Sequence, residues 1–295
     1  MALTQLLDVP APAKLNLFLH VVGRRNDGYH LLQSVFMLID WCDTLHFERR
    51  TDGQIHRRDL RSDAQPSDTL PVDDLTVRAA QLLQRASGTP LGADITLDKH
   101  IPMQAGLGGG SSDAASTLLA LNRLWGLHWP ITQLLPLGAQ LGADVPFFLG
   151  GRNAWVEGIG EQLTPINLPP ARFLVLKPPA GVATPDIFRH PLLKRDEKHH
   201  IIEDFLANAA PDNHEPLFAW GVNNLQPVAQ ALCPQIGEGL QWLAQAGLSG
   251  RMTGSGSALF APLTPQAEVA APPPGWQARI CKNLSLHPLM EQNSG

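Results

Sequence analysis

The chain has 295 residues, a hydrophobic content of 44% and a formal net charge of -5. This length and composition predict a globular protein with one large domain or two of ordinary size. Its arginines are interspersed with aspartates, so nucleic acid is not expected to be a partner.

The cysteines and the N-terminus bear on the compartment. Cys42, Cys233 and Cys281 lie far apart and form no Cys-x-x-Cys pair, which predicts neither a disulfide framework nor a zinc site and favours a reducing environment. The N-terminal residues lack a basic segment followed by an apolar one, and no later run approaches ~18 apolar residues. We therefore expect a cytoplasmic protein without a membrane partner.

Strand and helix patterns are mixed along the chain. The segment AKLNLFLHVV at 13–22 alternates, so that its leucines face one way while Lys14 and Asn16 face the other. We expect this polar face to carry the chemistry. More strand is predicted within 35–48, whereas the charged stretch 49–72 is expected to form a loop or an irregular hairpin.

The remaining elements complete a mixed pattern. We expect helices at 74–86, 111–125 and 131–141, strands at 93–99, 153–157 and 172–177, helices within 222–246, and strands around 251–261 and 277–281. The polar, proline-punctuated residues after 187 predict a linker or a surface excursion. These elements predict an α+β fold with two domains, which we divide at 1–160 and 161–295.

A glycine-rich stretch, PMQAGLGGGSSDAA at 102–115, stands between a predicted strand and a predicted helix. Its glycines permit positive φ angles and let backbone N–H groups approach a bulky anion. Ser111 and Ser112 stand at the helix start, where the helix dipole favours negative charge. A flexible surface turn is the simpler alternative, but the flanking strand, helix and serines favour a phosphate cradle.

The common phosphate-loop and hydrolase signatures are absent. No G-x-x-x-x-G-K-[ST] occurs, and Ser111 stands at the last glycine position of G-x-G-x-x-G. G-x-S-x-G and H-E-x-x-H are also missing, which excludes the most frequent hydrolase and zinc peptidase motifs.

Four segments in order resemble the motifs of the GHMP small-molecule kinases: PAKLNLFLHVVGRRNDGYH at 12–30, the glycine stretch, LGADVPFFLGG and RMTGSGSALF. The similarity is greatest to the branch that phosphorylates the 2-hydroxyl of 4-diphosphocytidyl-2-C-methyl-D-erythritol. An extra glycine in the loop is typical of this branch, whereas Gln104 and Ala105 stand where glycines are common. The resemblance implies an N-terminal ATP-loop domain, a ferredoxin-like C-terminal domain and an active site in the cleft between them.

The resemblance also implies ATP as phosphoryl donor together with Mg²⁺. Backbone N–H groups would hold the phosphates, one of the two serines would lie near a magnesium ion that keeps much of its water, and Leu107 would only pack. The implied ATP-binding residues are Pro102, Met103, Gln104, Ala105, Gly106, Leu107, Gly108, Gly109, Gly110, Ser111 and Ser112.

Asp144 in LGADVP and Lys14 resemble the catalytic aspartate and lysine of the family. Without the resemblance, a turn aspartate and a solvated strand lysine are the simpler interpretations. As a pair, the ammonium would keep the carboxylate ionised and withdraw charge from the attacking oxygen. The carboxylate would accept the hydroxyl proton late or only position the hydroxyl, and the sequence leaves both roles open.

The residues that match the family's substrate site are Tyr29, His30 and Phe188. The resemblance implies that the cytosine ring lies between the two aromatic rings while the histidine bonds the base edge, with Asn16 and Thr184 as further substrate contacts. A core tyrosine, a surface histidine and a buried phenylalanine are the simpler interpretation of each residue alone.

Other motifs and functions stay open. The turn TGSGSA at 253–258 would touch phosphate or substrate, or merely connect two core strands, and the histidines at 199 and 200 are expected on a solvated face rather than in a metal site. A noncatalytic nucleotide or sugar-phosphate sensor of the same fold is one alternative function, but the presence of Lys14 and Asp144 favours an enzyme. A kinase for mevalonate, homoserine or a sugar is the other.

Overall fold

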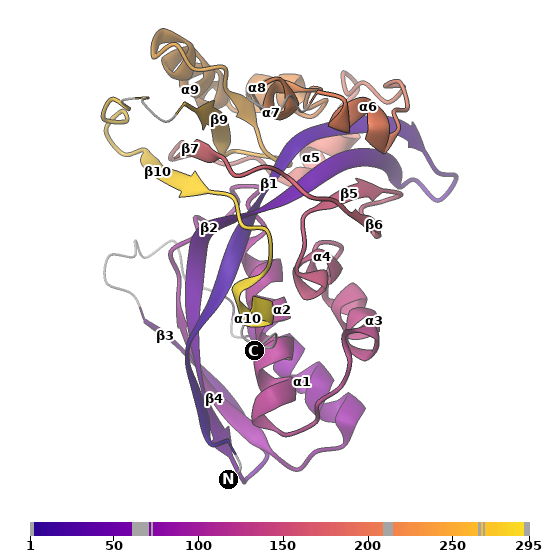
Figure 1. Ribbon diagram of the computed structural model, residues 1–295, viewed down its shortest axis with the longest axis vertical. Coiled ribbons are helices and arrows are strands. Elements are labelled where there is room, and N and C mark those ends of the chain that lie inside the picture. The colour runs from indigo at the N-terminus through magenta and orange to yellow at the C-terminus, as the bar shows by residue number, and fades with distance from the viewer. Residues whose placement is uncertain are drawn as a thin grey trace.

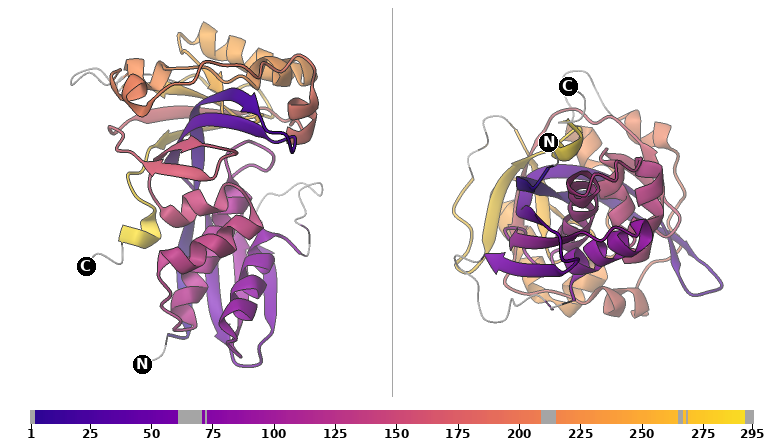
Figure 2. Two further views of the ribbon diagram at one scale, coloured as in Figure 1. Left: turned by 90° about the vertical axis from the view of Figure 1, so that its right-hand side faces the viewer. Right: turned by 90° about the horizontal axis from the view of Figure 1, so that it is seen from below.

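The computed structural model describes residues 3–60, 71, 73–208, 215–264, 267 and 269–291. The protein is elongated, with one part built from the N-terminal strands and helices and a second part that contains the later helices (Figure 1). Two further views show the long N-terminal hairpin running from the first part into the second (Figure 2). Within the described ranges, no helix is long and apolar enough to span a bilayer.

The N-terminal part contains a six-stranded sheet in the order β3-β4-β2-β5-β6, with β1 paired to β2. Its strands are β1 (Gln5–Arg24), β2 (His30–Arg50), β3 (Ile55–Leu60), β4 (Gly92–Asp98), β5 (Ala154–Glu157) and β6 (Gln162–Pro165). Strand β2 pairs with β4 through residues 44–50 and with β5 through residues 34–36. Strand β2 therefore connects the part of the sheet that contains β3 and β4 with the part that contains β5 and β6.

The N-terminal part has four helices: α1 (Leu75–Ser87), α2 (Gly109–Leu124), α3 (Ile131–Leu141) and α4 (Val145–Gly150). Helices α1 and α2 contact the sheet, and α3 packs on the other helices. Asp74 is the N-cap of α1 and its side chain accepts the Val77 N–H, while Gly88 caps the other end in the left-handed conformation. The alanines of α2 and all its leucines except the partly buried Leu119 are buried against the sheet and the other helices. This packing fixes the start of α2, where the glycine-rich loop ends.

The second part contains a four-stranded sheet in the order β10-β7-β9-β8. Its strands are β7 (Arg172–Lys177), β8 (Arg251–Met252), β9 (Leu259–Leu263) and β10 (Gln277–Lys282), and its helices are α5 (Thr184–Arg189), α6 (Ile202–Leu206), α7 (Glu215–Ala219), α8 (Gln226–Leu232) and α9 (Pro234–Gln245). A short helix, α10 (Pro288–Glu291), returns the chain to the first part (Figure 1).

Strand β1 joins the two parts. Leu19 donates its N–H to Val222 O at 2.9 Å and accepts the Asn224 N–H at 2.8 Å. Leu19 and Val21 are buried in the same apolar cluster as residues of β7, β9, α8 and α9. The strand that carries Lys14 near its middle is therefore anchored at its end in the second part.

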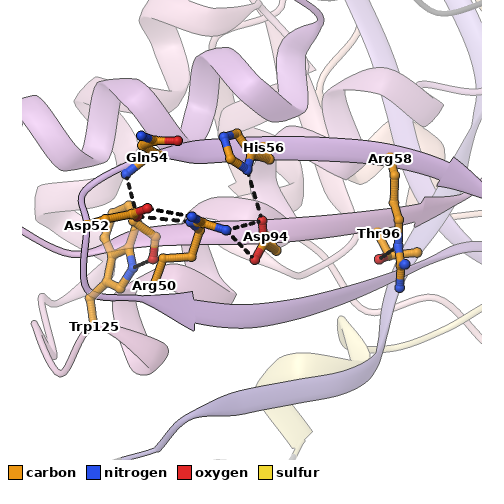
Figure 3. Close-up of polar contacts among 9 residues, drawn as sticks. Arg50, Asp52, Gln54, His56, Arg58, Asp94, Thr96 and Trp125 are labelled. Atoms are coloured by element: carbon orange, nitrogen blue, oxygen red, sulfur yellow. Dashed lines mark hydrogen bonds and ion pairs between the residues drawn. The ribbon is translucent and has the colours of Figure 1, made fainter.

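The expectation of a loop or irregular hairpin over 49–72 is wrong for residues 55–60, which form β3 and pair in parallel with β4. Polar side chains link the strands across the exposed face (Figure 3). Asp94 on β4 lies 2.9 Å from Arg50 Nη1 and 3.2 Å from His56 Nδ1. The high charge that suggested a loop thus belongs to an exposed sheet face. Residues 61–70 and 72 of this stretch lie outside the described residues.

The polar segment after 187 is a surface excursion. It begins at the end of α5, passes over the β1–β2 hairpin and continues into α6, where Phe205 is buried. Gln33 of β2 accepts the His200 N–H at 2.9 Å and donates to His200 O at 2.8 Å. We call residues 190–201 the crossing segment. It holds the second part on the tip of the hairpin.

Candidate active site

The glycine-rich stretch connects β4 to the first turn of α2. Gly108 is the N-cap of α2 at φ 73°, and the first helical bond runs from the Ser112 N–H to Gly108 O at 2.9 Å. The N–H groups of Gly109, Gly110 and Ser111 precede that bond, so the helix offers them no acceptor. They are available to an anion at the positive end of the helix dipole.

Close packing explains two of the glycines. A Cβ at Gly106 would lie 2.5 Å from Thr253 O, and one at Gly108 would lie 2.9 Å from Phe148 Cζ and 3.1 Å from Lys14 Cγ. Both residues also have positive φ, which side chains rarely adopt. The loop therefore packs directly against Lys14 and against the turn at 253–257.

This loop forms one wall of a cleft of about 670 Å³. Every residue from Pro102 to Ser111 lines it, while residues 182–185 with Ser255 and Gly256 contribute from the second part. Thr184 Oγ1 lies 2.6 Å from Ser255 Oγ, which ties α5 to the 253–257 turn. The volume suits a nucleotide-sized ligand.

Lys14 and Asp144 meet beside the loop. Lys14 Nζ lies 3.7 Å from Asp144 Oδ2, and the two side chains are 5% and 31% exposed. Burial lowers the pKa of Lys14, whereas the charge of Asp144 acts to raise it. The pair combines a desolvated ammonium with a carboxylate that solvent can reach.

A hydrogen-bond network fixes the Lys14 head group. Lys14 donates to Asn16 Oδ1, and its Nζ lies 4.6 Å from the centre of the Phe36 ring. The Asn16 amide donates to Ser34 Oγ at 2.9 Å, and its backbone N–H donates to Thr253 Oγ1 at 2.7 Å. Asn16 is thus committed to holding Lys14, and the 253–257 turn is part of the same site.

The two loop serines occupy different positions. Ser111 lines the cleft, whereas Ser112 is fully buried and its Oγ has no hydrogen-bond partner among the described residues. Within the same ranges, no group of three or more His, Cys, Asp or Glu could hold a metal. Magnesium in nucleotide sites commonly relies on phosphate oxygens, water and few protein ligands, so Ser111 fits that role better than Ser112.

A buried charge cluster supports the loop from behind. Lys99 Nζ lies 2.7 Å from Asp113 Oδ2 and also contacts Asp43. Asp43 accepts the N–H groups of His100 and Ile101 at 2.6 and 2.8 Å. Burial raises the pKa of Asp113 well above its usual value, while Lys99 opposes that shift. The cluster connects both ends of the loop to β2.

Two of the three predicted base-binding residues lie together. The His30 and Phe188 rings have centres 5.0 Å apart and are inclined by 31°. Tyr29 is 59% exposed, and it makes no ring contact within the described part of the chain. A stack that includes Tyr29 therefore stays a prediction.

Sequence reasoning missed Arg195 and the Lys99 cluster. Arg195 stands in the charged stretch KRDEKHH, which gives no reason to separate it from its solvated neighbours, yet its Nε donates to His30 Nε2 at 3.0 Å. Lys99 and Asp113 flank the glycine loop with opposite charges. That flanking pattern could have suggested an ion pair across the loop.

Comparison with protein families gives matches in both parts of the chain. Residues 74–152 match the GHMP kinases N terminal domain, and residues 201–271 match the GHMP kinases C terminal family. The first range contains the glycine loop and Asp144, and the second contains the 253–257 turn.

Individual proteins are similar over almost the whole chain. A 4-diphosphocytidyl-2-C-methyl-D-erythritol kinase of Polaromonas naphthalenivorans (strain CJ2) is 65% identical over 288 residues, which cover 97% of this chain and 96% of that protein. A crystal structure of 4-(cytidine 5'-diphospho)-2C-methyl-D-erythritol kinase has a TM-score of 0.71 at 38% identity, covering 86% of this chain and 88% of that one.

A more distant structure shares the fold alone. The Methanococcus jannaschii mevalonate kinase has a TM-score of 0.67 at 13% identity, covering 96% of this chain and 99% of that one. Because kinases for different substrates share this fold, the substrate has to be argued from the site and from the more similar proteins.

Proposed function

This chain belongs to the GHMP kinase family and, within it, to the 4-diphosphocytidyl-2-C-methyl-D-erythritol kinases, and we propose the 2-hydroxyl of that compound as its phosphoryl acceptor. It is a small-molecule kinase that uses ATP and acts in the non-mevalonate route to isoprenoid precursors. The single observation that carries this conclusion is the 65% identity over 97% of the chain.

The glycine loop is the proposed ATP phosphate site. The N–H groups at the start of α2 would bind phosphate oxygens, and the glycines let the backbone approach them closely. Bound Mg²⁺ would neutralise charge on the phosphates, and Ser111 is the residue we propose beside it. The cleft wall at 182–185 would close over the nucleotide from the other part.

Lys14 and Asp144 are the proposed catalytic pair. Phosphoryl transfer mostly requires alignment and charge neutralisation, plus a group that receives or orients the hydroxyl proton. The Lys14 ammonium would withdraw negative charge from the attacking oxygen, and Asp144 would receive its proton late or position it. The 3.7 Å separation and the unequal exposure of the two side chains support this division of roles.

The substrate base would bind at His30 and Phe188, with Tyr29 as the second stacking face. The close approach of the His30 and Phe188 rings supports this location, and the exposure of Tyr29 leaves its ring accessible to a ligand. Thr184 would hold substrate near the bond it makes with Ser255. Asn16 would act mainly through Lys14, because its side chain is already bonded.

An ADP-release assay across candidate acceptors tests the function. We expect turnover with 4-diphosphocytidyl-2-C-methyl-D-erythritol and none above background with mevalonate, homoserine or galactose. Phosphorus NMR of the product would then locate the new phosphate at the 2-position. Release of ADP with mevalonate but not with the cytidyl compound would overturn the proposal, and binding without turnover of any acceptor would favour a nucleotide sensor.

Two further proposals concern the whole chain. We propose a cytoplasmic location, supported by the cysteine pattern and by the pathway of the similar enzymes. We also propose that residues 1–160 and 161–295 act as two domains that close on the nucleotide. Cleft walls contributed by residues from both ranges support this division.

A further inference from the structure

Arg195 stands at the contact between the crossing segment, α5 and β2. Its Nε donates to His30 Nε2 at 3.0 Å, and its Nη1 donates to Leu193 O at 2.9 Å. Its Nη2 donates to Phe188 O at 3.1 Å and to His190 O at 2.9 Å. A single guanidinium therefore connects the backbone of Phe188 with the ring of His30.

The bond to His30 determines where the imidazole carries its proton. A guanidinium is always protonated and can only donate, so His30 Nε2 must accept and cannot carry a hydrogen in this arrangement. In a neutral ring, the hydrogen then resides on Nδ1. Burial and the nearby charges of Arg195 and Arg24 lower the pKa of His30, which keeps the ring neutral at physiological pH.

We propose that Arg195 is a positioning residue that holds His30 as the Nδ1–H tautomer against Phe188, and thereby makes the site select cytosine over uracil. This inference rests on the proposed function, because it concerns the base of that substrate. Cytosine has an acceptor at N3, which an Nδ1–H group can bond, whereas uracil has an N–H there. A donor that faces another donor leaves both without a partner, which disfavours the wrong base.

The geometry supports positioning rather than direct contact with the base. The guanidinium already makes four hydrogen bonds to protein groups, which engage all three of its nitrogens. Within the described part of the chain, His30 Nδ1 makes no hydrogen bond, so it remains available to a ligand. Arg195 therefore acts through His30 and through the position of Phe188.

The first test is the tautomer of His30 in the wild-type protein without ligand. We expect nitrogen-15 NMR at neutral pH to give the pattern of an Nδ1–H imidazole, with the signal assigned by its loss in His30→Gln. In Arg195→Met the pattern should move to the Nε2–H form that free imidazole side chains prefer. An Nε2–H pattern in the wild-type protein would overturn the proposal. Because this test needs no turnover, its outcome is independent of the proposed function.

The second test is kinetic and uses Arg195→Met, Arg195→Lys and the control Lys198→Gln. Lys198 is an exposed cation of the crossing segment that does not contact His30. In both Arg195 variants we expect a higher KM for the cytidyl substrate, an unchanged KM for ATP, and a preference over the uridyl analogue that falls about tenfold or more. Lys198→Gln should behave as wild type.

The remaining outcomes also decide. Wild-type turnover with an unchanged cytidyl preference in both folded Arg195 variants would refute the role of Arg195 and leave the function intact. No wild-type turnover of the cytidyl compound would refute the function, while the tautomer measurement would still decide the role of Arg195. Retention of the preference by Arg195→Lys together with its loss in Arg195→Met would support the positioning role, because a lysine ammonium can also donate to His30 Nε2.

Discussion

At the scale of single residues, the Lys14–Asp144 pair places a buried cation beside an accessible carboxylate. Replacing Asp144 by asparagine keeps the shape of the side chain but removes its charge and its capacity to accept a proton. We expect kcat to fall by about 10²-fold or more if Asp144 is a general base, with the KM for ATP nearly unchanged. The measurement is steady-state ADP release.

Asp196→Asn is the matched control, because Asp196 is an exposed carboxylate of the crossing segment. It should retain wild-type kinetics. Near-normal turnover by a folded Asp144→Asn protein would remove Asp144 from the mechanism, and a modest decrease would favour the positioning role over proton transfer.

The aromatic residues of the base site give a second prediction at this scale. Stacking contributes ~1 to 3 kcal/mol per base, so Tyr29→Ala or Phe188→Ala should raise the KM for the cytidyl substrate about 5- to 150-fold. The KM for ATP should change little. Leu192→Ala, which truncates a side chain that is 76% exposed, is the control. An unchanged KM in Tyr29→Ala would show that its exposed ring does not contact the base.

At the scale of elements, the loop before α2 depends on its glycines. Gly108→Val would place a branched side chain between Phe148 and Lys14 at a positive φ angle. We expect a severely raised KM for ATP and a lower kcat, since both the loop and the proposed catalytic lysine would be displaced. The measurement is the ATP dependence of ADP release by a variant whose fold is verified by circular dichroism.

Gly88→Val is the matched control, because Gly88 has a similar φ of 67° at the end of α1 but has no other atoms within 4 Å of an added Cβ. This variant should lose some stability and keep its affinity for ATP. If a folded Gly108→Val protein bound ATP as well as wild type, the loop would not be the phosphate site.

Most elements could be predicted from hydrophobic period and from turn residues. The helix predicted over 131–141 has those bounds, and the one predicted over 74–86 spans Leu75–Ser87. The strand predicted over 13–22 is shorter than β1, because Pro10 and Pro12 interrupt the alternating pattern on which the prediction is based. The pairing of β1 with β2 shifts register between Pro12 and Ala13. Among the described strands of this sheet, β1 pairs only with β2, so the N–H that each proline lacks is tolerated.

The site was less predictable than the elements, for a physical reason. The glycine loop can be recognised in the sequence, because its backbone conformation restricts the residue types within it. The proposed role of Arg195 depends on the crossing segment lying over β2. Nothing in the neighbouring polar sequence indicates that contact. The buried position of Lys14 likewise depends on residues distant in the sequence, because its backbone N–H donates to Leu107 O and its Nζ lies over the Phe36 ring.

At the scale of the whole molecule, buried histidines link stability to pH. Burial lowers the pKa of His20 to about 4 and that of His287 to about 4. In the unfolded chain both histidines have a pKa of about 6.5, so the unfolded state binds more protons than the folded state below that pH. The free energy of unfolding should therefore decrease as the pH falls from about 6.5 towards 4. The maximum slope is about 1.4 kcal/mol per pH unit for each histidine.

Urea unfolding at pH 7.5, 6.0 and 5.0 tests this expectation. His287→Gln should weaken the pH dependence, because the variant lacks one of the two buried imidazoles that take up a proton on unfolding. The raised pKa of Asp113 makes the folded state more stable as the pH falls, which opposes the effect of the histidines. The informative quantity is therefore the difference in pH dependence between the variant and the wild-type protein. Identical pH slopes for both proteins would show that His287 is not buried in its neutral form.

The division of the chain into two domains also belongs to this scale. Strand β1 begins in the N-terminal sheet and ends in the apolar core of the second part, and the β5–β6 hairpin continues from residue 154 to residue 165. The chain therefore crosses between the two parts more than once. A domain boundary at residue 160 stays a prediction about which residues move together when the cleft closes.

The most direct measurement compares ADP release by the wild-type protein with 4-diphosphocytidyl-2-C-methyl-D-erythritol and with 2-C-methyl-D-erythritol 4-phosphate. Both compounds carry the acceptor hydroxyl, and only the first carries the base that His30, Phe188 and Tyr29 would bind. Two stacked faces contribute ~2 to 6 kcal/mol, so kcat/KM should favour the cytidyl compound at least about 30-fold. Equal kcat/KM for the two compounds would contradict both the base site and the proposed substrate.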